Sequence, residues 1–580
     1  MCRIFGYVGR DLDTAALHAA RDAQVSGGPD SQSHARGEKW GLGCNRLAIQ
    51  DPSHGEQPFT HAGGSLRAVF NGEIYNFRAI KAELAAHGVY IDGDSDGNVL
   101  LPYYELHGDR FVDRLQGMYA IAIVDLRSGR PWLKLWCDPL AVKSVYYADT
   151  GDGVAFSSEL RGLAPLLDKP PDVNPFAVDD YMNWQCLPNG SSWYTGVSAL
   201  RPGEQLTCDG AVSVIRPRPQ APAPAADDAC TPDRLGALLA REVAHMSLQS
   251  APTAVQISGG LDSSILATLL RERRPDVTGF HVTHEGNHLS DELLYAREAA
   301  AHARVPLEVV EIREADLPDL VPATVRALGT PNATPHALSA FVLFREIAAS
   351  GFRVCFVGDG ADEQFGGYRR YSTALAAGDT AWPSRYLDRL SLVPEGEYRQ
   401  LYTPDYRALL DSRTRSRQRS LEALNRPAPS RLEQLLTFDR LHKLPSLNLR
   451  KLDHLSMAHA VEGRVPYCQP ALTEFARRTP DTLKAGGAGH KRILWEAGAS
   501  KVPPAVRDRQ KQPFTFPVSA FMAPGGKLWD FTLDTLTSPR LCSAGFLSAK
   551  AVQNVITEHK DGQDHARLLW GLMALELSLP

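Results

Sequence analysis

Short apolar runs separated by turns make up the first third of the chain, and helical periodicity is clear only over 77–87. Short strands with few helices between them are typical of antiparallel sheets. We therefore predict mainly antiparallel sheet with a few covering helices for this part. The strand-like runs cover 4–9, 40–49, 66–71, 119–126, 132–136 and 145–147.

Downstream, strand-like and helix-like segments alternate. Such alternation predicts a parallel sheet with helices on both faces. Beyond about residue 385 the chain is mostly helical in pattern, so the expected fold class is α/β with two domains. The predicted strands are 253–257, 277–283, 306–312 and 352–357, and the helices between them include 291–303 and 338–349.

A Pro/Ala-rich segment, 216–228, separates the two patterns. Proline fixes the backbone and cannot continue a helix or a central strand, so this segment is expected to be a semi-rigid linker. The predicted domains are therefore 1–215 and 229–580, since 580 residues are too many for one core.

Composition is that of an ordinary globular enzyme, with 43% apolar and 22% charged residues. The net charge of −5, without a long basic run, argues against a nucleic-acid partner. No apolar stretch is long enough to cross a membrane, and the N-terminus lacks a secretory signal pattern. The nine cysteines are scattered without a C-x-x-C pair, so we expect reduced thiols and a cytoplasmic location.

The run from Ser258 to Ser264 predicts a phosphate-binding loop, because it follows an apolar strand and opens a helix. Backbone N–H groups at such a turn and the dipole of the following helix favour an anion. The serines add hydroxyl donors, and Asp262 can hold a Mg²⁺ ion that bridges phosphate oxygens. The predicted nucleotide-binding residues are Ser258, Gly259, Gly260, Leu261, Asp262, Ser263, Ser264 and Gly358.

Gly358 opens a second Gly-rich, acidic loop after the strand 352–357. Open α/β sheets bind ligands at the C-terminal ends of their strands. Asp362 is therefore expected to share the metal with Asp262 and to stabilise a leaving pyrophosphate, with Asp359 beside it.

Cys2 is a candidate nucleophile. Removal of the initiator Met would give this cysteine a free α-amine, with a pKa of about 7.7–8.0, that can accept the thiol proton. Asn71 and Gly72 at the end of a strand can form an oxyanion hole. Arg46 can pair with a substrate carboxylate and Asp96 with a substrate α-amine, which together suit glutamine.

Two later segments have a less specific pattern. The segment 444–467 predicts an amphipathic helix that ends in a buried Glu462/Arg464 pair. Lys511 offers a cation in a loop that can stabilise charge on a phosphate.

Residues 1–205 resemble the N-terminal-nucleophile glutaminase of class II glutamine amidotransferases, whose fold is an αββα sandwich. The resemblance rests on Cys2 and on the motifs 28–30, 46–47, 71–73, 95–96 and 156–159. It implies that Cys2 attacks the glutamine amide and releases ammonia. Asn71 and Gly72 would hold the oxyanion, and Arg46, Glu73 and Asp96 would hold the amino-acid end.

The C-terminal part resembles the ATP-pyrophosphatase domain of the asparagine synthetase family. The runs 258–264, 358–368 and 451–467 and the Lys511 segment occur in the family's order. The resemblance implies ATP and Mg²⁺, adenylation of an acceptor carboxylate, catalytic roles for Asp359 and Lys511, and passage of ammonia through an internal tunnel. The default acceptor is aspartate, and relatives suggest a homodimer.

Several positions depart from the family pattern. Arg3 follows the nucleophile where the family usually has Gly, and Gly27 stands where the family has Arg before Gly-Pro-Asp. Asn98 replaces a usual Glu, and 137–141 replaces an Arg-Asp-Arg-x-Gly turn. Asp359 replaces Glu, and 329–336 differs from the residues usual in aspartate enzymes.

The departures at Asp359 and 329–336 leave open an amide synthetase of specialised metabolism that acts on another carboxylic acid. A cyclising synthetase is disfavoured, because such relatives commonly have a disabled glutaminase while Cys2 is retained here. A non-catalytic pseudoenzyme is disfavoured because Cys2, Asp262 and Asp362 are all present.

Overall fold

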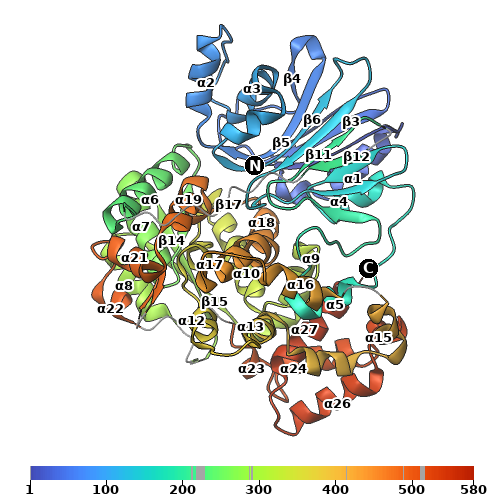
Figure 1. Ribbon diagram of the computed structural model, residues 1–580, viewed down its shortest axis with the longest axis vertical. Coiled ribbons are helices and arrows are strands. Elements are labelled where there is room, and N and C mark those ends of the chain that lie inside the picture. Colours follow the sequence, from blue (N-terminus) through green and yellow to red (C-terminus); the bar gives the residue numbers. More distant parts are fainter. Residues whose placement is uncertain are drawn as a thin grey trace.

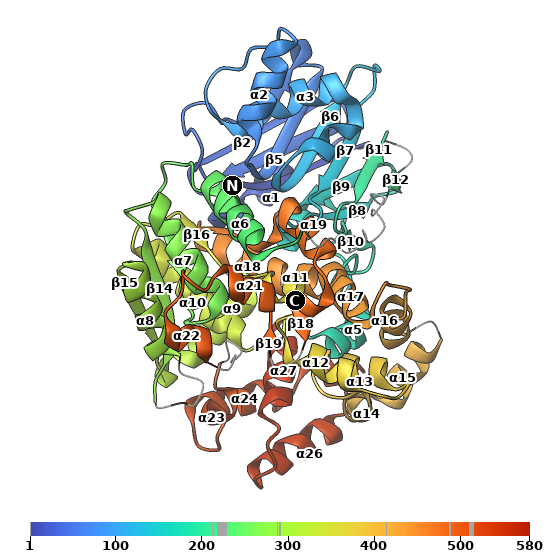
Figure 2. The same cartoon turned by 60° about the vertical axis from the view of Figure 1, so that its left-hand side comes forward.

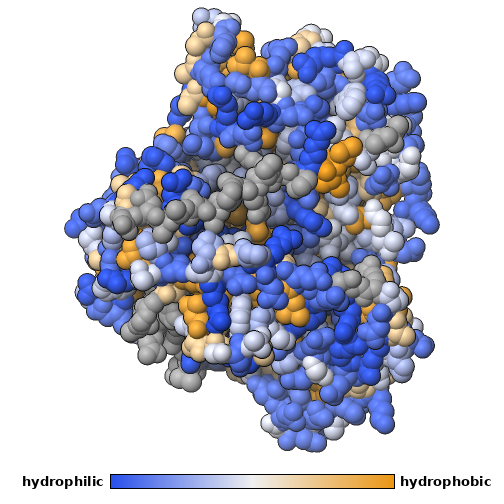
Figure 3. Space-filling view, viewed as in Figure 1, coloured by the Kyte–Doolittle hydropathy of each residue, from blue (hydrophilic) through white to orange (hydrophobic). Residues whose placement is uncertain are grey.

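The computed structural model describes residues 2–210, 213–216, 229–286, 288, 292–412, 415–486, 489–509 and 516–579. Most of the expected linker and Lys511 itself lie outside these residues. No described helix is long and apolar enough to cross a membrane. The face drawn in Figure 3 is mostly hydrophilic, with hydrophobic residues in small groups.

Two six-stranded antiparallel sheets form the N-terminal half (Figure 1). The first has the order β10 (Val197–Ala199), β8 (Tyr146–Asp149), β9 (Val154–Ser157), β1 (Cys2–Val8), β3 (Trp40–Arg46), β2 (Ser31–Gly37). The second has the order β12 (Ser213–Arg216), β11 (Gln205–Cys208), β7 (Trp132–Cys137), β6 (Gly117–Asp125), β5 (Leu66–Ile74), β4 (Phe59–His61).

Alternating side chains from the facing sides of the two sheets fill one core, which includes Ile4, Leu42, Val69 and Ala122. Helices α1 (Thr14–Asp22) and α4 (Leu160–Leu163) contact the outer face of the first sheet. On the outer face of the second sheet, α2 (Phe77–Ala86) and α3 (Leu100–His107) share its apolar cluster. The predicted αββα sandwich is confirmed.

The C-terminal half contains the predicted parallel sheet, in which every pairing is parallel. Its order is β15 (Leu307–Ile312), β14 (Thr278–His284), β13 (Thr253–Gln256), β16 (Val354–Phe356), β17 (Glu462–Arg464). The strand order reverses between β13 and β16, and such a switch point is where open parallel sheets bind ligands. The phosphate-loop candidate follows β13 and the second acidic loop follows β16, so this topology brings the two loops together.

The prediction for 444–467 is partly wrong. The chain is helical over Asp439–Leu449 and in α18 (Arg450–Met457), but Glu462 and Arg464 lie on strand β17 and not at a helix end. Three residues are too few to show a strand period, and β17 forms because its backbone pairs with β16. The expected burial of the Glu462/Arg464 pair is confirmed.

The two halves meet near α18 (Figures 1 and 2), and a buried ionic cluster surrounds Asp453 of this helix. Arg3 Nη1 lies 2.9 Å from Asp453 Oδ2, and Lys143 Nζ lies 2.9 Å from Asp453 Oδ1. All three side chains are at most 1% exposed. Although burial by itself raises the pKa of Asp453, Arg3 and Lys143 hold that pKa far below its usual range.

Asp453→Asn is expected to lower the free energy of unfolding by about 3–5 kcal/mol, because it leaves two buried cations without their shared carboxylate. Urea denaturation measures the change. Asp168→Asn is the control, since Asp168 pairs with the buried Arg10 but is 77% exposed. We expect a loss of less than about 1 kcal/mol for this control, and equal losses for the two variants would contradict a special role of Asp453.

Candidate active sites in the two halves

Cys2 begins β1 and lies at the junction of the halves, as the N label in Figure 2 indicates. Its side chain is buried, and its backbone N–H donates to Asn71 Oδ1 over 3.2 Å. Gln57 Nε2 donates to Cys2 Sγ over 3.2 Å, while the same amide is held by the backbone of Phe70. Cys2 is therefore held by groups from two separate segments, the loop of Gln57 and strand β5.

The environment of the Cys2 thiol favours its ionised form. Burial raises its pKa, but a hydrogen bond with Cys44, another from the backbone of Leu47 and the positive charge of Arg46 act in the opposite direction. The net effect lowers the pKa of Cys2 to about 7. Cys44 is the partner that stays protonated, because burial and the neighbouring Cys2 raise its pKa well above the ordinary value.

Asn71 and Gly72 lie on β5, next to the strand end where Cys2 lies. The Oδ1 atom of Asn71 accepts from the Cys2 backbone, and its Nδ2 is buried without a hydrogen-bond partner among the residues that the structure describes. A buried amide donor without a partner is costly unless a ligand accepts its hydrogen bond. This geometry suits the predicted oxyanion hole.

Two of the three predicted glutamine-binding residues, Arg46 and Asp96, are held by backbone groups. Arg46 is the cross-strand partner of Cys2, and its guanidinium donates to the carbonyls of Pro52 and Asp51. Asp96 Oδ2 accepts from the N–H of Ile74 over 2.7 Å, and burial raises the pKa of Asp96 to about 6. Arg46 thus orders the loop before Gln57 as well as facing the site.

Glu73 connects the glutaminase candidate to the other half. Its Oε2 lies 3.6 Å from Arg464 Nη2 on β17. Burial and the charges of Glu462 and Asp96 raise the pKa of Glu73 well above its usual value, while Arg464 lowers it. Glu73 therefore lies at the interface of the halves.

The loop after β13 has the geometry of an anion site. Helix α7 (Leu261–Arg273) begins after Gly260, and Ser258 Oγ and Ser263 Oγ lie 3.1 Å apart. Gly259 has φ +76°, and a Cβ there would lie 2.7 Å from the backbone N of Ala296. Glycine is needed here because the backbone is left-handed and packs directly on α8 (Leu293–Ala303).

Asp262 and Asp362 lie close enough to share one cation. Lys491 Nζ lies 2.6 Å from Asp262 Oδ2 and 2.8 Å from Asp362 Oδ1. Burial lowers the pKa of Lys491, but the two carboxylates outweigh it and raise that pKa. Two hard carboxylates that converge on one ammonium fit Mg²⁺, which takes one or two carboxylates and completes its shell with phosphate oxygens and water. Among the described residues no group of three His, Cys, Asp or Glu side chains could hold a metal.

Asp359 lies between β16 and α11 (Ala361–Phe365), where burial raises its pKa and the charge of Lys451 lowers it. Lys451 Nζ lies 2.6 Å from His336 Nε2 at the start of α10 (His336–Ala349). Burial lowers the pKa of Lys451 to about 8 and that of His336 well below its ordinary value. The segment 329–336, expected near the acceptor, therefore ends beside Lys451 and close to Asp359.

Gln57, Cys44 and Lys491 are three contact residues that the sequence pattern did not identify. Cys44 lies two residues before Arg46 on a strand, and side chains two residues apart point to the same face of a sheet. Because Arg46 is the cross-strand partner of Cys2, strand periodicity could have placed Cys44 on the face of Cys2. Gln57 and Lys491 carry no comparable signal, since a loop glutamine and a lysine before a helix are ordinary surface residues. Only the fold brings them to the two sites.

Comparison with known families assigns a family to each half of the chain. Residues 1–216 match the family described as Glutamine amidotransferase domain, which is the class defined by the N-terminal half. Residues 234–580 match the family described as Asparagine synthase. The chain belongs to the asparagine synthase family.

Relatives match along most of the chain. Asparagine synthetase [glutamine-hydrolyzing] 1 of Bacillus subtilis is 26% identical, over 95% of this chain and 91% of its own. Asparagine synthetase [glutamine-hydrolyzing] 3 of the same organism is 26% identical, over 89% and 87%. Amidase chry2 of Gibberella zeae is 24% identical, over 93% and 90%.

The alkylation rate of Cys2 by iodoacetamide is expected to rise with pH around a midpoint near 7, because only the thiolate reacts. Cys44→Ala removes the hydrogen bond and should raise the midpoint by about one unit, or about 1.4 kcal/mol. Cys44→Ser keeps a donor and should leave the midpoint near that of the wild type. Peptide mass spectrometry across a pH series measures the rate at Cys2 separately from the other thiols. A midpoint near 9 in the wild type would contradict the stated environment.

Lys491→Met is expected to make Mg²⁺ a stronger stabiliser of the nucleotide-free protein. The ammonium competes with a metal for the two carboxylates, and a ligand raises the melting temperature through its affinity for the folded state. Thermal unfolding with and without MgCl₂ should give a larger shift in the variant than in the wild type. Lys501→Met is the control, because Lys501 is 31% exposed and pairs with Glu272 away from this site. Equal MgCl₂-induced shifts of the melting temperature in the wild type and both variants would show that Asp262 and Asp362 do not form a metal site.

Proposed function

We propose that the chain is a glutamine-dependent, ATP-dependent amidotransferase of the asparagine synthetase type, with ammonia release in one half and carboxylate adenylation in the other. The observation that carries this proposal is the pairing of a buried, activated Cys2 with a carboxylate pair at the switch point of a parallel sheet. Family membership supports a glutamine-dependent ligase. The domains would be 1–215 and 229–580, joined by 216–228.

In the N-terminal half, Cys2 would attack the side-chain carbonyl of glutamine after loss of Met1, with its α-amine as the proton acceptor. The N–H of Gly72 and the free Nδ2 of Asn71 would receive the developing oxyanion. Arg46 would bind the α-carboxylate, and Asp96 and Glu73 would bind the α-amine. The C–N bond would then break, the nitrogen would take the proton and leave as ammonia, and hydrolysis of the thioester left on Cys2 would release glutamate.

In the C-terminal half, the loop 258–264 and Gly358 would hold the phosphates of ATP at the start of α7. Asp262 and Asp362 would hold Mg²⁺, which supplies positive charge to the leaving pyrophosphate. Asp359 and Lys451 would line the acceptor side, and Lys511 would meet the phosphate that becomes AMP. Ammonia would then displace AMP from the acyl-adenylate to give the amide.

The path of ammonia between the sites must exclude water. Free ammonia is mostly protonated at neutral pH and is then no nucleophile, so an internal tunnel would preserve its reactivity. The buried junction of β1, β17 and α18 lies between the halves and is the expected region of this tunnel. The buried charges there would have to be paired, as Arg3, Asp453 and Lys143 are.

Aspartate is the default acceptor, but a second candidate function is amide formation on another carboxylic acid. Asp359 is one methylene shorter than the usual Glu, and the 329–336 segment presents a neutral His336 to Lys451. Asp359 and the 329–336 segment are both expected on the acceptor side, so they would influence which acid binds there. Relatives of similar coverage also include Amidase chry2.

An acceptor screen that measures pyrophosphate and AMP, with glutamine or ammonium chloride as nitrogen source, tests the proposal. Aspartate is expected to be turned over under the leading assignment, while turnover of another acid alone favours the second candidate. Cys2→Ala should reduce glutamine-dependent synthesis by at least about 10³-fold and retain ammonia-dependent synthesis.

Asp262→Asn should stop pyrophosphate release with both nitrogen sources and leave glutamine hydrolysis measurable. Loss of ammonia-dependent synthesis in a folded Cys2→Ala protein would contradict the two-site scheme. Unchanged pyrophosphate release by Asp262→Asn would remove this residue from the nucleotide site.

A further inference from the structure

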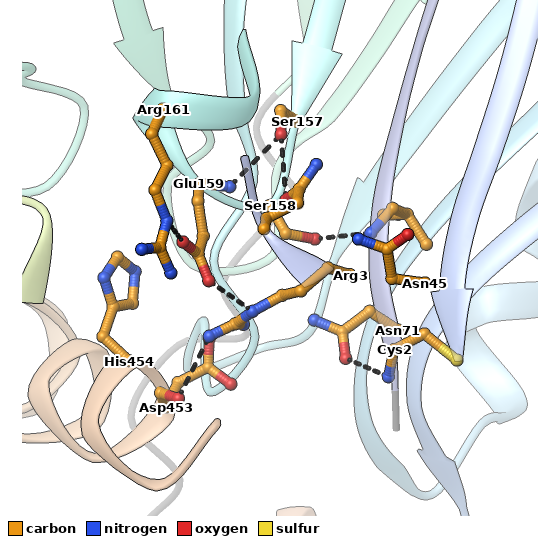
Figure 4. A network of polar contacts seen from close by, with 12 residues as sticks. Cys2, Arg3, Asn45, Asn71, Ser157, Ser158, Glu159, Arg161, Asp453 and His454 are labelled. Carbon is orange, nitrogen blue, oxygen red and sulfur yellow. Dashed lines mark hydrogen bonds and ion pairs between the residues drawn. The ribbon is translucent and has the colours of Figure 1, made fainter. Parts of the chain in front are cut away.

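Arg3 is a buried charge directly beside the nucleophile. Its side chain is 0% exposed, and Figure 4 shows it reaching from the strand of Cys2 toward Glu159 on one side and Asp453 on the other. Nε lies 2.7 Å from Glu159 Oε1, Nη1 lies 2.9 Å from Asp453 Oδ2, and Nη2 donates to the Asp453 carbonyl over 3.3 Å. The guanidinium of Arg3 thus connects Glu159 of its own half to the carboxylate and the backbone carbonyl of Asp453 in the other half.

Gly27 provides the room for this side chain. A Cβ at position 27 would lie 2.7 Å from both Cγ and Nε of Arg3, which is closer than real Cβ contacts. The backbone of Gly27 is not left-handed, so glycine is needed here for space and not for conformation. A side chain at 27 and the observed arginine at 3 are therefore mutually exclusive.

The two departures from the family pattern therefore meet in space, as an exchange of one arginine between the two positions would require. The usual pattern has Gly after the nucleophile and Arg at position 27, whereas this chain has Arg at 3 and Gly at 27. In this chain the arginine in the space between β1 and the turn Val25–Gly27 belongs to the strand that carries Cys2.

Helix α18 links this arginine to the other site. Asp453 lies two residues after Lys451, whose Nζ is 2.6 Å from His336 Nε2 and which is an electrostatic neighbour of Asp359. A rigid helix transmits a displacement of one residue to the next turn. Asp453 therefore connects Arg3 to the helix that carries Lys451, the residue expected on the acceptor side.

We propose that Arg3 is a positioning residue that couples the glutaminase strand to the synthetase helix, and that it replaces the arginine expected at position 27. This proposal rests on the proposed function. Through its contacts to Glu159 and Asp453, Arg3 holds the Cys2 end of β1 in register with α18. Loss of this contact would allow Cys2 to hydrolyse glutamine without matching amide formation.

The test compares the wild type with Arg3→Gly, Arg3→Lys, Gly27→Arg and the double variant Arg3→Gly/Gly27→Arg. Glutamate and pyrophosphate are measured with glutamine, MgATP and L-aspartate, and in parallel with the acid found in the acceptor screen. The ratio of glutamate to pyrophosphate is the readout, with ammonia-dependent synthesis as the measure of an intact C-terminal half. Arg10→Ala is the matched control, because Arg10 is also buried but pairs with Asp168 within its own half.

The proposal expects the ratio to rise by at least about fivefold in Arg3→Gly, at unchanged ammonia-dependent synthesis. Arg3→Lys should lie in between, since lysine keeps the charge but not the fork that reaches two acceptors. The double variant should recover coupling relative to Arg3→Gly. A ratio in Arg3→Gly equal to that of the wild type or of Arg10→Ala overturns the coupling role.

Thermal unfolding of the same variants tests the exchange without reference to activity. Gly27→Arg should lower the melting temperature while Arg3 is present and should lower it less, or raise it, in the Arg3→Gly background. Additive effects of the two substitutions would overturn the exchange. A wild type that releases no pyrophosphate with any acid would contradict the proposed function but leave the unfolding result to decide the exchange.

Discussion

A single carboxylate, that of Asp453, has to be satisfied by cations from the other half of the molecule. Removing such a charge from water costs several kcal/mol unless its partners are close and well oriented. Arg3 and Lys143 meet this requirement only if β1 and α18 are in register. The ionic cluster therefore fixes how the sandwich of the N-terminal half meets the parallel sheet of the C-terminal half, and the relative position of the two candidate sites depends on it.

A second buried link lies on the other side of the Cys2 site. Glu73 on β5 faces Arg464 on β17, which is paired with Glu462 and hydrogen-bonded to Gln249. Strand β17 is the neighbour of β16, and β16 leads into the loop of Asp359 and Asp362. The Arg3–Asp453 contact thus connects the glutaminase candidate to α18, and the Glu73–Arg464 contact connects it to β17, the neighbour of the strand before the acidic loop. Buried polar contacts of this kind suit two reactions that must exchange an intermediate without water.

Departures from a family pattern are more informative in pairs than one at a time. Arg3 lies on β1 and Gly27 in the turn Val25–Gly27, so the sequence alone does not show that the two positions are in contact. Their side-chain volumes are complementary in space, so the structure accounts for both with one rearrangement. The turn after Cys137 is a similar case: Asp138 accepts backbone N–H groups from Leu140, Val142 and Lys143, and so holds a turn whose sequence differs from the usual one.

The sequence by itself determined the fold class, the sheet types and the two motif clusters, because period-two alternation, βα alternation and glycine-rich turns are local signals. It also placed Cys2 and Asp262 at a strand end and a helix start, where the structure has them, whereas Asn71 lies inside β5 and not at its end. Only the tertiary structure decided what depends on contacts between distant segments. These are the strand β17, the hydrogen bonds of Gln57 and Cys44 to the thiol, the ammonium of Lys491 between two carboxylates, and the fit of Arg3 against Gly27. The physical reason is that burial and pairing set the cost and the pKa of a charged group, and neither is a property of its neighbours in the chain.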